Sequence, residues 1–161
     1  MLNIAQLQTL KAYIEADQTL AALWAEGGAG LIADALNGPA SPSFIVWRTS
    51  VTQDEIMQNG FDWVQVDNLS VGKARIWEWM FNNEERAMNP AKLNVRAGIE
   101  ECWRGTAAML AVRAAVYVHC KRAATMVEKL FASGAGTGAT PATLTFEGEL
   151  SFMEVVAAMR G

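Results

Sequence analysis

Residues 67–81 predict a helix with more apolar surface than one buried face can use. Ile76, Trp77 and Phe81 fall within one apolar stripe, because residues three and four positions apart are neighbours on a helix. Trp79 lies two positions from both Trp77 and Phe81, about 200° round the helix from each, so it projects elsewhere. We therefore expect Trp79 to meet the surface of another molecule and the protein to work by contact.

The composition is that of a globular protein. Of the 161 residues, 52% are hydrophobic and 19% are charged, which excludes a wholly disordered chain and favours one domain. The longest apolar run, residues 107–118, is interrupted by Arg113 and is shorter than the roughly 20 residues of a membrane span. The start of the chain lacks the pattern of a signal peptide. We expect a protein made in a cytoplasm, with no membrane partner.

Helix start and stop signals predict a mainly α fold of about seven helices. Capping boxes begin at Asn3, Thr52 and Ser151, where a hydroxyl or amide residue precedes Gln or Glu by three positions. Ser70 is expected to cap the tryptophan-rich helix, and Asn89 to precede a helix that begins at proline. The expected helices cover residues 4–16, 18–26, 31–36, 52–59, 70–82, 90–103, 106–132 with a bend or break near Lys121, and the segment after Ser151.

One or two short strands are expected beside these helices. Residues 44–47 are rich in β-forming side chains, and residues 142–146 alternate like a strand. Residues 133–141 contain three glycines and no large side chain, so we expect an arm that is flexible or fixed only by a partner. The chain is therefore divided into a helical domain, 1–132, and a C-terminal part, 133–161, that belongs to the same domain or docks on a partner.

The net charge of −4 is unevenly distributed. Residues 102–132 carry five cations and a single glutamate, which could suit phosphate or an acidic partner. Cations eight or nine positions apart rotate around a helix, however, so a solvated surface is favoured over direct nucleic-acid binding. The candidate contacts for phosphate or an acidic partner are Arg104, Arg113, Lys121 and Arg122.

No constellation of residues indicates catalysis or a cofactor. Cys102, Cys120 and His119 are too few ligands for a structural zinc site, so both cysteines are expected to be reduced and to pack as small apolar side chains. The adjacent pairs at 84–85 and 100–101 are glutamates, and neighbouring helical side chains point about 100° apart. We expect a protein that is not an enzyme and that has no cofactor and no metal.

Five segments lie in order along about two-thirds of the chain: residues 44–49 (FIVWRT), 67–73 (DNLSVGK), 94–99 (NVRAGI), 121–134 (KRAATMVEKLFASG) and 140–148 (TPATLTFEG). Together these segments resemble small proteins encoded in tailed-phage and prophage genomes. The resemblance implies a virion or assembly protein, within that class a neck subunit of the head-to-tail adaptor type, assembled in the host cytoplasm. It transfers no catalytic residues.

The leading hypothesis is a non-enzymatic structural protein that forms a homo-oligomeric ring on the phage portal or tail. A capsid-decorating or tail protein would fit the same features. The alternatives are a small DNA-binding regulator that uses residues 102–132 and a phage hydrolase that uses Glu and Asp pairs. The expected interface residues are Ile76, Trp77, Trp79, Phe81, Leu144 and Phe146.

Overall fold

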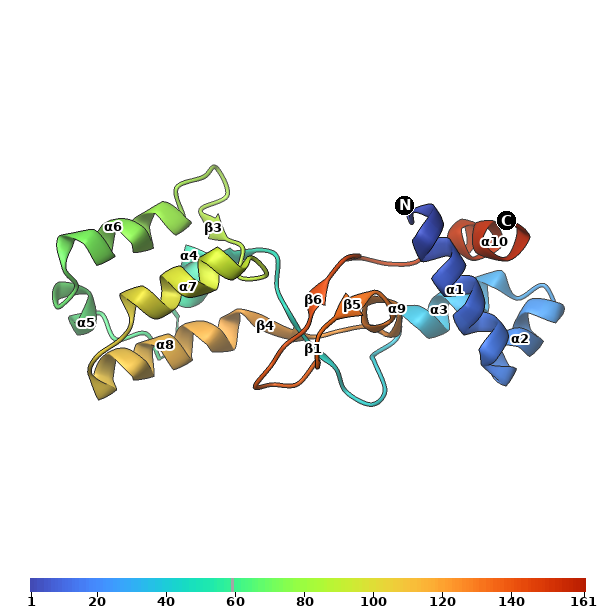
Figure 1. Ribbon diagram of the computed structural model, residues 1–161, viewed down its shortest axis with the longest axis horizontal. Coiled ribbons are helices and arrows are strands. Elements are labelled where there is room, and N and C mark those ends of the chain that lie inside the picture. Colours follow the sequence, from blue (N-terminus) through green and yellow to red (C-terminus); the bar gives the residue numbers. More distant parts are fainter. Residues whose placement is uncertain (59) are drawn as a thin grey trace. The chain divides into compact units, whose positions relative to one another are not determined.

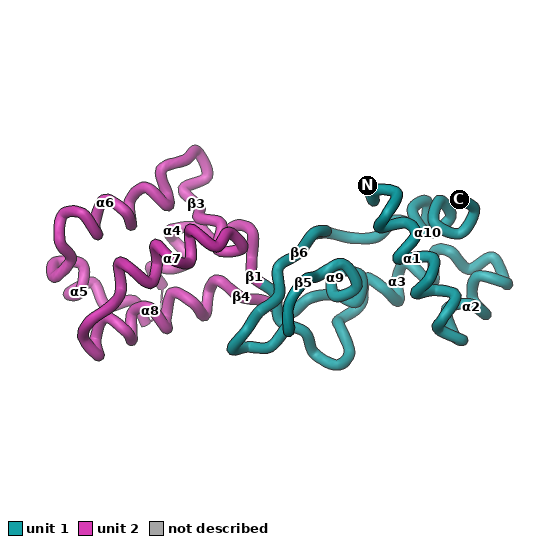
Figure 2. Tube along the Cα trace, in the orientation of Figure 1, with its two compact units in different colours: residues 1–46, 123–161 teal, residues 47–122 magenta. Residues whose placement is uncertain are grey.

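The computed structural model describes residues 1–58 and 60–161, and the chain forms two compact units (Figure 2). Unit 1 contains Met1–Val46 and Ala123–Gly161, and unit 2 contains Trp47–Arg122. Unit 2 is thus inserted into unit 1. The boundary expected at residue 132 is not a boundary between these units, since residues 133–161 group with the first 46.

The fold is mainly α, as the sequence predicted, with ten helices and six short strands among the described residues. The predicted number of about seven helices is too low. The expected stretch 106–132 is broken near Lys121, where a bend or break was expected, into two helices, α8 (Ala107–His119) and α9 (Met126–Leu130), with strand β4 (Lys121–Ala123) between them. In the described part of the chain, no helix has the length and apolar character needed to cross a membrane.

In unit 1, helices from both ends of the chain share one core (Figure 1). Helices α1 and α3 both pack against α10, and α2 contacts α1 and α3. The capping boxes predicted at Asn3 and Ser151 are both formed. The helices are α1 (Ile4–Ala16), α2 (Gln18–Ala25), α3 (Ala29–Asn37), α9 and α10 (Phe152–Arg160), and the fully buried core side chains include Leu10, Ile14, Ile32, Val127 and Val155.

The glycine-rich segment is not an arm but the loop of a β-hairpin in unit 1. Strand β5 (Ala132–Ser133) pairs antiparallel with β6 (Thr143–Leu144). The amide of Ile45 donates to the Gly136 carbonyl over 2.8 Å, and Gly136 is buried under the Phe44 ring. The segment is therefore held by its own unit, through long-range contacts that local composition does not reveal.

The two predicted strand segments also meet. Residues 44–47 contain β1 (Ile45–Trp47), which pairs with β4 in a two-stranded sheet. Val46 forms a parallel bridge with Ala142, whose amide donates to the Ile45 carbonyl over 2.9 Å. The strand expected over 142–146 is shorter than predicted, because regular pairing covers Thr143 and Leu144.

In unit 2, helix α7 contacts both α6 and α8, and Figure 1 shows it between them. Phe61, Trp77 and Trp103 form the centre of the core, with the rings of Trp77 and Trp103 edge to face at 5.2 Å. The elements are α4 (Gln53–Ile56), α5 (Val64–Asp67), α6 (Val71–Met80), α7 (Leu93–Cys102), α8 and the antiparallel pair β2 (Val51–Thr52) and β3 (Ala87–Met88).

Two predicted helix boundaries in unit 2 need correction. The helix expected over 90–103 begins at Leu93, because the Asn89 side chain accepts from the Ala91 amide over 3.0 Å and forms a turn instead of a cap. The capping box at Thr52 is formed, but its helix α4 ends at Ile56. The predicted end at Asn59 lies outside the described residues.

Gly136 provides a test of the ordered hairpin loop. Its φ of +66° lies in the left-handed region, and a Cβ there would clash with the Phe44 ring. Gly136→Ala should therefore lower the free energy of unfolding by about 1–3 kcal/mol in urea denaturation followed by circular dichroism. Gly138→Ala is the matched control, since a Cβ there meets open space, and it should change stability by less than about 0.5 kcal/mol. Equal effects of the two substitutions would contradict the packing described.

Glu154 makes unit 1 sensitive to acid. Burial raises the pKa of this carboxyl, but hydrogen bonds from Ser151 and from the Leu2 amide outweigh burial and lower it below the usual value. Its Oε1 accepts from the Leu2 amide over 2.9 Å, and Oε2 accepts from the Ser151 hydroxyl over 2.9 Å. Because the folded-state pKa is lowered, this stabilisation is present above the ordinary Glu pKa and is lost as the pH falls through the folded-state value.

We expect Glu154→Gln to destabilise α1 and α10 by about 1 kcal/mol at pH 7 and to have little effect at pH 3. Amide hydrogen exchange of these two helices is the measurement, because it reports on unit 1 separately from unit 2. Glu15→Gln, at an exposed position of α1, is the control and should leave the stability of these helices unchanged at both pH values. If Glu154→Gln destabilises the two helices as much at pH 3 as at pH 7, the ionised carboxylate does not stabilise them.

Candidate interaction surface

Helix α6 presents Trp79 to solvent while it buries Trp77. The Ser70 hydroxyl accepts from the Lys73 amide over 3.4 Å and caps the start of the helix, as predicted. Trp77 is 7% exposed, whereas Trp79 is 72% exposed. The helical spacing therefore predicted correctly that the two indoles face different surroundings.

Trp77 and Phe81, which are among the expected interface residues, are largely enclosed in their own unit, although both line a hollow beside Trp79. Both are buried, and their rings contact each other edge to face at 5.2 Å. Trp77 also packs against Trp103 at 5.2 Å, so it belongs to the core of unit 2. Trp77 and Phe81 are buried because they lie on the face of α6 that packs against the rest of unit 2.

Ile76 is half-buried and lies at the contact between α6 and α7. Gly98 on α7 faces it, and a Cβ at Gly98 would lie 3.5 Å from Ile76 Cγ2 and would press on the end of Met80. The absence of a side chain at this position lets the two helices approach closely. Among the expected interface residues of α6, Trp79 is the one with its side chain mostly in solvent.

The exposed indole borders a hollow of about 530 Å³ at the C-terminal end of α6. Glu78 lines this hollow. Asp54, Glu84 and Glu85 line a second hollow, which shares Gln53 and Arg86 with the first. Arg86 borders both, and its guanidinium donates to the Gln53 side chain. We call Asp54, Glu78, Trp79, Glu84, Glu85 and Arg86 the Trp79 surface, which carries four acidic groups and one basic group.

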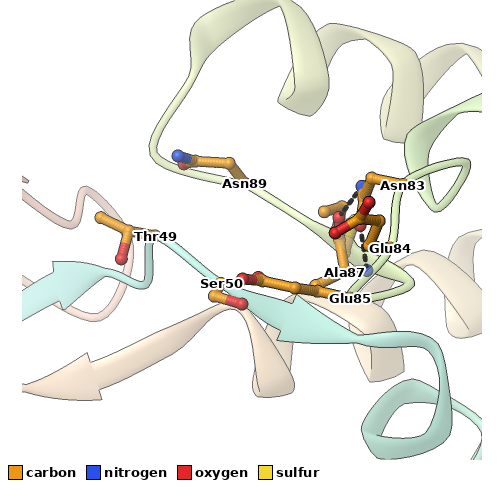
Figure 3. A pocket seen from close by; sticks show the side chains of 8 residues that line it. Thr49, Ser50, Asn83, Glu84, Glu85, Ala87 and Asn89 are labelled. Carbon is orange, nitrogen blue, oxygen red and sulfur yellow. Dashed lines mark hydrogen bonds between the residues drawn. The ribbon is translucent and has the colours of Figure 1, made fainter.

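The turn after α6 holds Glu84 and Glu85 beside a further hollow of about 410 Å³. The Asn83 side chain fixes this turn: its amide donates to the Ala87 carbonyl over 2.6 Å, and its oxygen accepts from the Ala87 amide over 3.1 Å. Figure 3 shows Glu85 extended toward Ser50 and Glu84 beside Asn83. The two exposed carboxylates extend in different directions and do not face each other across a cleft.

The expected interface residues of the C-terminal part lie in unit 1. Leu144 is half-buried against the small cluster of Val46, Ala124 and Ala142. Phe146 is half-buried, with its ring 5.7 Å from that of Phe131. Both side chains therefore pack mainly against residues of unit 1.

The four candidate basic residues do not form one face. Arg104 is paired with Glu101 over 2.8 Å. Arg113 and Lys121 border a common hollow of about 440 Å³ with Leu110, Tyr117 and Val118. Arg122 follows Lys121 on β4, and successive strand residues point to opposite sides. Two of the four are therefore brought together by the fold, at the C-terminal half of α8.

A cation–aromatic cluster at Trp47 was not expected from the sequence. The Arg96 guanidinium lies 4.7 Å from the centre of the Trp47 ring, and the Lys121 ammonium lies 5.5 Å from it. The Tyr117 hydroxyl donates to Glu100 over 3.1 Å, and burial raises the pKa of this hydroxyl. These residues come from β1, α7, α8 and β4, so no local pattern could have revealed the cluster.

Both cysteines are free and buried. Burial raises the pKa of Cys102 to about 11 and that of Cys120 to about 12, so both are thiols at neutral pH. A protonated, enclosed thiol is a poor nucleophile and a poor metal ligand. Across the described residues, no group of three or more His, Cys, Asp or Glu side chains is placed to hold a metal ion.

The chain matches no protein-family model, no curated protein and no solved structure.

Trp77 and Trp79 form a matched pair for testing which indole supports the fold. Trp77→Ala should lower the free energy of unfolding by about 3–5 kcal/mol, because it leaves a cavity beside Trp103. Trp79→Ala should change it by less than about 0.5 kcal/mol, because the indole makes few contacts within its own unit. Urea denaturation followed by circular dichroism measures both. A large loss of stability in Trp79→Ala would show that the exposed indole supports the fold.

Proposed function

We propose that the protein is a non-enzymatic structural subunit of a tailed-phage particle, a head-to-tail adaptor that assembles as a homo-oligomeric ring on the portal or tail. The observation that carries the proposal is the 72% exposed side chain of Trp79 on a helix whose other aromatic residue, Trp77, is buried. Its partners would be further copies of the chain and the portal or tail proteins. It would be assembled in the host cytoplasm and retained in the virion.

The energetics of the indole support a contact role. A tryptophan side chain buries about 150–250 Å² when it is fully enclosed, and each Å² of apolar area contributes roughly 25 cal/mol. Covering the exposed part of Trp79 would therefore contribute roughly 3–4 kcal/mol to binding. Tryptophan is also among the residues enriched where interfaces have their largest energies.

The phage context comes from the ordered segments that resemble small phage and prophage proteins. One of them, residues 67–73, leads directly into α6, the helix that carries Trp79. A capsid-decorating or tail protein would use the same surface. A DNA-binding regulator is less well supported, because Arg104 is paired with Glu101, and Lys121 and Arg122 are successive residues of β4 that point to opposite sides of the strand.

Mass spectrometry of purified phage particles from the producing host tests this function directly. We expect the chain in the particle at a fixed stoichiometry, as for a ring subunit. Particles from a host in which the gene carries Trp79→Ala should contain less of the chain. A host carrying Leu93→Ala should give normal particles, because Leu93 is an exposed apolar residue on α7 that lines neither hollow at the Trp79 surface. Complete absence of the wild-type chain from particles would overturn the proposal.

A further inference from the structure

Helix α8 has an apolar stripe on its exposed side as well as on its buried side. Met109, Val112 and Val116 face the core. On the other side, Leu110 and Val118 are 41% and 73% exposed, and Ala114 lies between them at four-residue spacing. A helix that is apolar on all sides is usually covered on all sides, so the exposed stripe of α8 resembles a surface that receives a partner.

The hollow beside this stripe has the size and surroundings for an aromatic side chain. Its volume of about 440 Å³ is lined by Leu110, Ala114 and Val118 along the helix, by Arg113 and Lys121, and by Tyr117 and Glu100, which are hydrogen-bonded to each other. We call Leu110, Arg113, Ala114, Val118 and Lys121 the α8 surface. An indole placed there would contact the apolar stripe and would bring the acidic groups around it close to Arg113.

The charges of the two surfaces are opposite. The Trp79 surface carries Asp54, Glu78, Glu84 and Glu85 against Arg86. The α8 surface carries Arg113 and Lys121, and Glu100 also lines its hollow, so this surface has a net positive charge. Figure 1 shows α6 and α8 on opposite sides of unit 2, so one copy can present its Trp79 surface to the α8 surface of the next.

Resting on the proposed function, which takes Trp79 as the assembly contact, we infer that Trp79 of one copy docks in the α8 hollow of a second copy. Pairing α8 with α8 across a two-fold axis would instead bring two basic segments together, which is unfavourable. A contact between two different surfaces repeats from copy to copy and closes into a ring when its rotation allows. Both surfaces belong to unit 2, so the contact joins unit 2 of one copy to unit 2 of the next.

Two variants of the full-length chain test the head-to-tail arrangement. Trp79→Ala removes the inserted side chain, and Val118→Glu places an acidic group on the receiving surface without adding to the core, since Val118 is exposed. Each variant alone should associate at least tenfold more weakly than wild type in sedimentation equilibrium. Leu93→Glu, at an exposed apolar position on α7 outside both surfaces, is the control and should assemble like wild type.

The equimolar mixture of the two variants is decisive. Val118→Glu retains an intact Trp79 surface and Trp79→Ala retains an intact α8 surface, so the mixture should form a complex of two chains and no larger species. A mixture that remains monomeric while wild type assembles, a Val118→Glu variant that assembles normally, or a wild type that is monomeric at every concentration would each overturn the inference. The proposed function is tested separately, by mass spectrometry of phage particles. Failure of the head-to-tail contact can therefore be distinguished from failure of the proposed function.

Discussion

The packing of Trp77 against Trp103 determines what unit 2 can offer to a partner. Trp103 is completely buried at the end of α7, and the Trp77 ring meets it edge to face at 5.2 Å. Phe61 and Phe81 complete the same aromatic cluster. Because a helix is rigid, fixing Trp77 in this cluster fixes the rotation of α6 and so directs Trp79 into solvent. The exposed indole is thus a consequence of the core.

Local signals in the sequence predicted much of the fold. The helices at the start of the chain and the capping boxes at Asn3, Thr52 and Ser151 were located correctly, because each depends on residues within one helical turn. The box formed by Thr125 and Glu128 has the same pattern, and it begins α9 after the break expected near Lys121. The hairpin after residue 132 could not be predicted, since its loop is held by Phe44 and Ile45 far along the chain.

Part of the candidate surfaces could also be predicted from the sequence. Periodicity alone distinguished Trp79 from Trp77, because both lie on one helix. The second apolar stripe of α8 was present in the sequence, but which side is buried depends on the packing against α4 and α5. The placement of Arg96 and Lys121 on Trp47 depends on three elements meeting, which no single segment encodes.

The insertion of unit 2 into unit 1 has a consequence for the order of folding during synthesis. All of residues 47–122 are translated before α9, the hairpin and α10 exist, so the aromatic core can close while the ribosome is still adding residues. Unit 1 must wait, because α1 and α3 pack on α10, which is translated after unit 2. The helices α1 and α3 therefore lack this partner until residues 152–160 have been translated, and until then they expose apolar surface to which chaperones bind.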